Sequence, residues 1–96
     1  TDLQHRPMAR GIPLSEDQIL AIRTAAIDAG NISAAVCGMA RAWLDAKTPV
    51  RDPGGDIRQT LSLPGSLWAE VDAAAAKLGI SRSAAVRSAV EYCRQR

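Results

Sequence analysis

The segment "RQTLSLPGSLWAEV", residues 58–71, changes its periodicity partway through. Up to Leu63, polar and apolar residues alternate, which is typical of a strand with one buried face. Beyond Pro64, the apolar residues follow helical spacing, beginning with Leu67 and Trp68. A short strand that runs directly into a helix is not stable alone, so we expect it to have a partner strand.

The length and composition of the chain limit the fold. Its 96 residues are enough for one domain, or for two small units that share a core. Apolar residues make up 47% of the chain but aromatic residues only 3%, which favours closely packed aliphatic helices. The net charge of +2 is too small to indicate nucleic-acid binding by itself, although the basic excess lies after residue 50.

No feature of the sequence indicates a membrane or secreted protein. No apolar run reaches the length of a membrane span, and no signal-peptide pattern is present. Cys37 and Cys93 lie inside apolar helical patterns, where we expect buried thiols in a reducing compartment rather than a disulfide. We therefore expect a cytoplasmic protein with no membrane contact.

Apolar periodicity and helix-end residues predict four helices. Ser15 and Gln18 are spaced as a capping box at the start of the first helix, and Gly30 is a natural stop. A segment with two prolines and two glycines, residues 47–56, is a linker. The expected helix bounds are 15–30, about 32–46, 66–78 and about 82–95.

The order strand, helix, glycine, helix occurs twice along the chain. Ile12 and Leu14 precede the first helical pair as Leu61 and Leu63 precede the second, and Ser-Ala-Ala-Val recurs in both halves. The sequence therefore predicts a duplicated structural unit. The chain divides accordingly into residues 1–46, the linker 47–56 and residues 57–96, with the two units sharing one core.

The segment "IRQTLSLPGSLWAEVDAAAAKLGISRSAAVRSAVEYC" resembles the ribbon-helix-helix superfamily of DNA-binding proteins, the Arc, MetJ and CopG-like class. The resemblance covers residues 57–95, with a degenerate copy at about 8–46. It implies a mainly α fold with a short two-stranded antiparallel ribbon that enters the major groove. If the two copies pair with each other, the chain would form a single-chain pseudo-dimer.

The resemblance also implies DNA-contacting residues. Arg58, Thr60 and Ser62 lie on the outward face of the strand, where they would contact base edges. The alternative for these three side chains is the solvated face of an amphipathic strand. The start of the last helix would contact phosphates through three residues, Ser81, Arg82 and Ser83.

Other residues extend or weaken this interface. Ser81 also has a simpler role as a helix cap, and Arg82 as a solvated side chain. Further contacts to the DNA backbone are expected from Arg6, Arg10 and Arg87. The first repeat presents few polar groups, because its outward strand residues are Ala9, Gly11 and Pro13.

The partner of the second strand is either residues 8–14 of the same chain or the same strand of a second chain. The linker is long enough for the internal pair, and tethering raises the effective concentration of the internal strand. Pro13 argues the other way, because it cannot donate a ladder hydrogen bond. We favour the internal pair.

Enzymatic functions are poorly supported. The single histidine, His5, lies in a polar N-terminal segment, which disfavours a Ser-His-Asp arrangement. Two cysteines and one histidine, widely separated, do not form a zinc site, and we expect no metal or other cofactor.

Three functional classes remain. The first is a sequence-specific binder of double-stranded DNA, acting as a transcriptional repressor or as an accessory factor in plasmid transfer (conjugation) or partition. Its partners would be DNA, itself in a homodimer or higher assembly, and a relaxase. The second is an antitoxin with a toxin partner, and the third a helical protein-interaction module. Only the first two require salt-dependent binding to duplex DNA.

Overall fold

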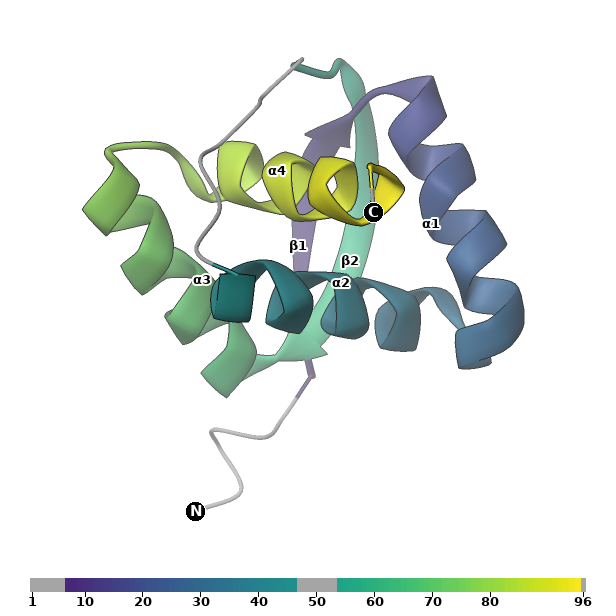
Figure 1. Cartoon of the computed structure of the whole chain (residues 1–96), viewed down its shortest axis with the longest axis horizontal. Coiled ribbons are helices and arrows are strands. Elements are labelled where there is room, and N and C mark those ends of the chain that lie inside the picture. The colour runs from purple at the N-terminus through teal and green to yellow at the C-terminus, as the bar shows by residue number, and fades with distance from the viewer. Residues whose placement is uncertain (1–6, 47–53, 96) are drawn as a thin grey trace.

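A computed structural model of the chain describes residues 7–46 and 54–95 (Figure 1). Within these residues, strands and helices follow each other in the order β-α-α-β-α-α. The elements are β1 (Pro7–Leu14), α1 (Glu16–Ala29), α2 (Ile32–Ala46), β2 (Ile57–Pro64), α3 (Gly65–Leu78) and α4 (Arg82–Arg94). The predicted mainly helical, repeated architecture is confirmed.

The two strands pair antiparallel within the chain and form a ribbon. Gly11 lies opposite Thr60, and the pairing ends with Leu14 opposite Ile57. Gly11 and Thr60 hold equivalent positions in the two repeats, so an approximate two-fold axis passes between them. The expectation of an internal strand pair is confirmed.

One face of the ribbon is buried and the other is open. On the buried face, Ile12 and Leu14 of β1 and Leu61 and Leu63 of β2 are at most 1% exposed. Helices α2 and α4 cross this face, with α1 and α3 at either side (Figure 1). The alternation seen in the sequence therefore corresponds to a ribbon covered by helices on one face.

Each repeat depends on the other for its packing. Helix α2 packs against β2 and α4 packs against β1, so the second helix of each repeat contacts the strand of the other. One core cluster of buried residues draws on all six elements. The predicted division of the chain at 47–56 stays a prediction, because residues 47–53 lie outside the described residues.

The helix ends lie where the sequence places them. The Ser15 hydroxyl accepts a hydrogen bond from the Gln18 amide, and the Gln18 side chain accepts one from the Ser15 amide, which completes the capping box. Gly30 and Gly79 end α1 and α3 with φ of 101° and 71°, a left-handed conformation that favours glycine. Ser81 caps α4.

Trp68 joins α3 to the ribbon. It is 3% exposed and belongs to the same core cluster as Leu61, Leu63 and Val86. Its indole Nε1 donates a 2.7 Å hydrogen bond to the carbonyl of Met8 on β1. This residue of the second repeat therefore holds the strand of the first.

We expect Trp68→Ala to lower the free energy of unfolding by about 3–5 kcal/mol, because it removes a buried aromatic side chain and its hydrogen bond. Urea denaturation followed by circular dichroism measures the change. The control is Leu20→Ala on α1, at a residue that is 54% exposed, where we expect a loss of less than about 0.5 kcal/mol. Equal midpoints for the Trp68 variant and the wild type would contradict this packing.

Gly55 lies against the junction between β1 and α1. A Cβ added at Gly55 would overlap the backbone of Leu14 and come within 2.7 Å of the Ser15 nitrogen. By contrast, a Cβ added at Gly38, on the exposed side of α2, would meet nothing within 4 Å. The chain entering β2 thus requires a residue without a side chain.

The two glycines should respond in opposite ways to alanine. Gly55→Ala should destabilise the fold by about 1–3 kcal/mol through backbone displacement. Gly38→Ala should stabilise it by about 0.5–1 kcal/mol, since alanine is the better helix former. Thermal denaturation of both variants compares them, and a Gly55→Ala protein as stable as wild type would be inconsistent with the close approach.

Candidate nucleic-acid interface

The outer face of the ribbon gathers the three residues predicted to contact bases. Arg58 and Thr60 are exposed and Ser62 is half-buried, and they alternate along β2 with its buried leucines. Three of the pairs on this face of the ribbon are Arg58 with Pro13, Thr60 with Gly11, and Ser62 with Ala9. We call these six residues the outer face.

The outer face is chemically asymmetric. Strand β2 supplies one cation and two hydroxyls, whereas Ala9, Gly11 and Pro13 of β1 supply no side-chain hydrogen-bonding group. The backbone of the ribbon is nearly two-fold symmetric, but its recognition chemistry is not. The sparse polar character of the first repeat is therefore a property of the folded surface as well as of the sequence.

Arg58 is the one charged residue on the outer face. Among the described residues, no carboxylate lies within ion-pair distance of its guanidinium. No carboxylate of the described residues therefore competes with an external acceptor for the donor groups of its exposed side chain.

The start of α4 offers a second group of donors. The Ser81 hydroxyl accepts a 3.1 Å hydrogen bond from the amide of Ala84, so Ser81 acts as the N-cap. The amides of Arg82 and Ser83 lie in the first turn, where an α-helix has no internal acceptor for them. This end of the helix carries the positive end of its dipole, which suits an anion.

Arg82 is already paired within the protein. Its Nε and Nη2 donate to the two carboxylate oxygens of Asp72 on α3 at 2.7 and 2.8 Å. Its Cζ lies 5.7 Å from the centre of the Trp68 ring. The side chain is still 37% exposed, so it lies at the surface but is tied to α3.

The charges around Asp72 favour its ionised form. The hydrogen bond from Arg82 is the main cause that holds the pKa of Asp72 below its usual value of 3.8, against the effect of burial. The charges of Arg82 and Arg10 act in the same direction. Arg10, predicted to contact the DNA backbone, is half-buried, and its Nη1 donates to the carbonyl of Ala9 at 3.2 Å.

The other two arginines predicted to contact the DNA backbone are Arg87 and Arg6. Arg87 is only 9% exposed, and its Nη1 donates a 2.9 Å hydrogen bond to the carbonyl of Pro13. It thus holds α4 against β1, which leaves little of its surface for a phosphate. Arg6 lies outside the described residues.

Sequence reasoning missed the role of Asp72. An acidic residue in the second half of one helix, followed by an arginine at the start of the next, is a signal for such a pair across a helical hairpin. It also missed Gln18 as a core residue, although the capping box named it. Gln18 is fully buried, and its Nε2 donates to Glu91 of α4 at 3.3 Å.

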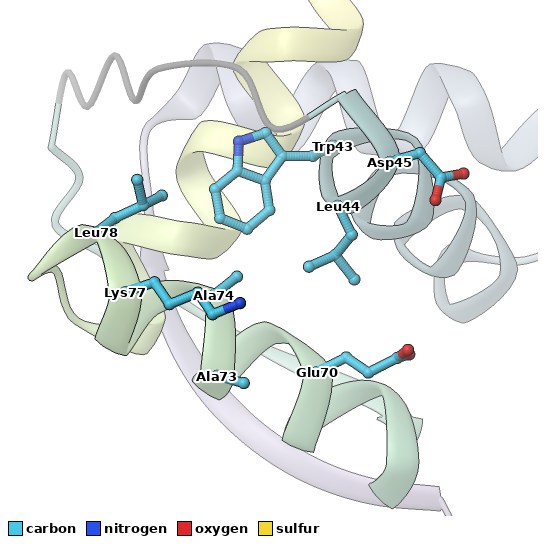
Figure 2. A pocket seen from close by; sticks show the side chains of 8 residues that line it. All are labelled: Trp43, Leu44, Asp45, Glu70, Ala73, Ala74, Lys77 and Leu78. Carbon is cyan, nitrogen blue, oxygen red and sulfur yellow. The ribbon is translucent and has the colours of Figure 1, made fainter.

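A groove of about 460 Å³ lies between α2 and α3 (Figure 2). Trp43 and Leu44 of α2 point toward Ala74 of α3, and Leu78 closes one end (Figure 2). Its full lining is Trp43, Leu44, Asp45, Glu70, Ala73, Ala74, Lys77 and Leu78. The groove therefore belongs to the helices and not to the ribbon.

Other kinds of site find little support in residues 7–46 and 54–95. In these residues no group of three or more His, Cys, Asp or Glu side chains could hold a metal ion. Cys37 and Cys93 are half-buried thiols; the Cys93 thiol donates to the carbonyl of Met39 at 3.9 Å, and burial raises the pKa of the Cys37 thiol. In the same part of the chain no single helix is long and apolar enough to cross a membrane; α1 and α2 together pass by length and composition only, with a bend of 103° between them.

No protein-family model matches the chain, and no curated protein or solved structure gives a significant match. The architecture, β-α-α repeated around a shared ribbon, is consistent with two ribbon-helix-helix units. The geometry of the outer face and of the α4 start is therefore what bears on the function of the chain.

The pair of Asp72 and Arg82 should make stability depend on pH in the acid range. Folding lowers the pKa of Asp72, so the pair stabilises the folded protein fully at pH values above the usual pKa of 3.8. This stabilisation is lost as the pH falls through the lower pKa of the folded protein. Both side chains are partly exposed, so we expect at most about 1 kcal/mol.

An NMR titration of the Asp72 carboxyl carbon measures this directly. Arg82→Ala should move the midpoint up toward 3.8, whereas Arg41→Ala, at an exposed arginine on α2, should leave it in place. If the Asp72 midpoint is the same in Arg82→Ala as in the wild type, the pair does not persist in solution.

Proposed function

We propose that the chain is a tandem ribbon-helix-helix protein that binds specific sequences in double-stranded DNA with its ribbon in the major groove. One observation carries the proposal. The strand register places Arg58, Thr60 and Ser62 together on the open face of an antiparallel ribbon, while the other face is packed under helices. A two-stranded ribbon fits the major groove, and its outward side chains reach base edges there.

The outer face suits base recognition by its chemistry. Arg58 carries a forked donor that matches the O6 and N7 acceptors of guanine. The hydroxyls of Thr60 and Ser62 donate or accept, so they can meet several base edges. In the described residues no carboxylate competes for Arg58, which favours this residue as the main determinant of sequence preference.

The start of α4 suits a phosphate. The first-turn amides, the Ser83 hydroxyl and the exposed part of Arg82 would contact one backbone oxygen cluster. Ser81 supports them by capping the helix. These contacts carry no sequence information, so they would add affinity on any duplex.

The asymmetry of the outer face has a consequence for the target. A homodimer of this superfamily presents two identical strands and binds a two-fold site. This chain presents one polar strand and one sparse strand, so we expect a non-palindromic preferred site for each molecule. Such a protein suits a transcriptional repressor, or an accessory factor that acts with a relaxase in plasmid transfer or in partition, in the cytoplasm.

The groove between α2 and α3 is the observation that favours the alternative functions, an antitoxin with a toxin partner or a helical interaction module. Five of its eight lining residues are apolar, and Leu78 at its end is 48% exposed. An antitoxin would still bind DNA through the ribbon. An interaction module would not, so salt-dependent binding to duplex DNA separates it from the other two.

Selection of binding sites from random duplex DNA, followed by substitution, tests the proposal. Arg58→Ala should cost about 1–3 kcal/mol of binding free energy on the selected site and much less on random DNA. Arg82→Ala should weaken both similarly and reduce the salt dependence by about one phosphate contact. Fluorescence anisotropy at several salt concentrations measures the affinity of each variant for the selected site and for random DNA.

The matched control is Arg41→Ala, which removes the same charge from an exposed position on α2. We expect it to leave the preference for the selected site unchanged. Equal losses on both DNAs for Arg58→Ala would refute base reading by Arg58, and the absence of any salt-dependent duplex binding by the wild type would refute the proposed function.

A further inference from the structure

Gly11 provides the space in which the Arg58 side chain lies. A Cβ added at Gly11 would come within 2.8 Å of Arg58 Nη1, 3.1 Å of its Cδ and 3.3 Å of its Cγ. The arginine stem and one guanidinium nitrogen thus pass directly over the glycine. The contact is diagonal, because the residue directly opposite Arg58 is Pro13.

The backbone at Gly11 does not itself require glycine. Gly11 lies inside β1, and it is not among the described glycines with positive φ, which are Gly30, Gly54 and Gly79. A glycine inside a strand gives up packing and conformational entropy, and it often marks a close approach by another group. The group that approaches here is the Arg58 side chain.

The direction of the side chain matters for recognition. Gly11 and Thr60 form one of the two middle pairs of the ribbon, and the approximate two-fold axis passes between them. Arg58 reaches toward Gly11, so its guanidinium points from the end of the ribbon toward its centre. An arginine held in one direction loses less conformational freedom when it binds a base than a freely rotating one does.

We propose that Gly11 is a positioning residue for Arg58 and directs its guanidinium to a guanine near the centre of an asymmetric site. The inference rests on the proposed function. It also assigns a role to the first repeat. The sparse strand β1 contributes no base contact of its own, but it supplies the space over which the reading residue of β2 is held.

The test compares Gly11→Ala with Gly38→Ala, the same chemical change at a position whose new Cβ meets nothing within 4 Å. On the selected duplex, Gly11→Ala should lower affinity about tenfold, a part of the discrimination that a bidentate arginine–guanine contact supplies. On random duplex it should change affinity less than about twofold, and Gly38→Ala should change neither. Thermal denaturation of both variants checks that they are folded.

A double-mutant cycle identifies the residue through which Gly11 acts. In an Arg58→Ala background, Gly11→Ala should cause no further loss on the selected duplex. Each guanine of the selected site is also replaced in turn, and the affinity of the wild-type protein for each duplex is measured. The guanine whose replacement lowers affinity most should lie near the middle of the footprint. The same loss from Gly11→Ala in both backgrounds, or a sensitive guanine at the edge of the footprint, would overturn the inference.

The free protein gives a readout that does not depend on DNA. NMR should show nuclear Overhauser contacts between the Gly11 α protons and the Arg58 δ protons, and their absence would overturn the inference. If these contacts are present but the wild type binds no duplex in a salt-dependent way, the proposed function fails and with it the reading role of Arg58. The NMR experiment tests the contact between Gly11 and Arg58, and the DNA-binding experiment tests the proposed function, so the two failures can be told apart.

Discussion

The pairing register of β1 with β2 is the constraint on which the rest of the structure depends. Because side chains alternate along a strand, a slip of one residue would turn the buried aliphatic residues of that strand to solvent. A two-stranded ribbon is only marginally stable alone, so the helices must cover one face of it. Since α2 packs on β2 and α4 on β1, the register also determines how the two repeats interlock.

Placing both repeats in one chain removes the symmetry that a homodimer must obey. In a homodimer every substitution appears on both strands, whereas here β1 and β2 can differ. Arg87 illustrates this freedom. It lies in α4 and donates to the carbonyl of Pro13, while the equivalent position of α2 is Cys37. The two repeats therefore share one backbone arrangement but differ in the side chains at equivalent positions.

Local patterns in the sequence predict most of the fold, because local physics determines it. Alternation predicts the strands, and Ser15 and Gly79 predict helix ends through their capping chemistry. The pairing of Arg82 with Asp72 and the burial of Arg87 could not be predicted in this way, since they depend on how separate helices meet. On the outer face, alternation alone predicts that Arg58 points outward, but only the register shows that it lies beside Gly11.

The charges around Arg82 and Arg58 determine how much each would contribute to affinity and to sequence specificity at the proposed interface. Arg82 must share its guanidinium between Asp72 and a phosphate, so its gain on binding DNA is reduced by the weakening of an existing ion pair. Arg58 gives up no ion pair with the described residues. With a net charge of only +2, general attraction to the DNA backbone is small. Discrimination between sequences would therefore depend on the ribbon, and within the ribbon on Arg58, which forms no ion pair with a carboxylate of the described residues.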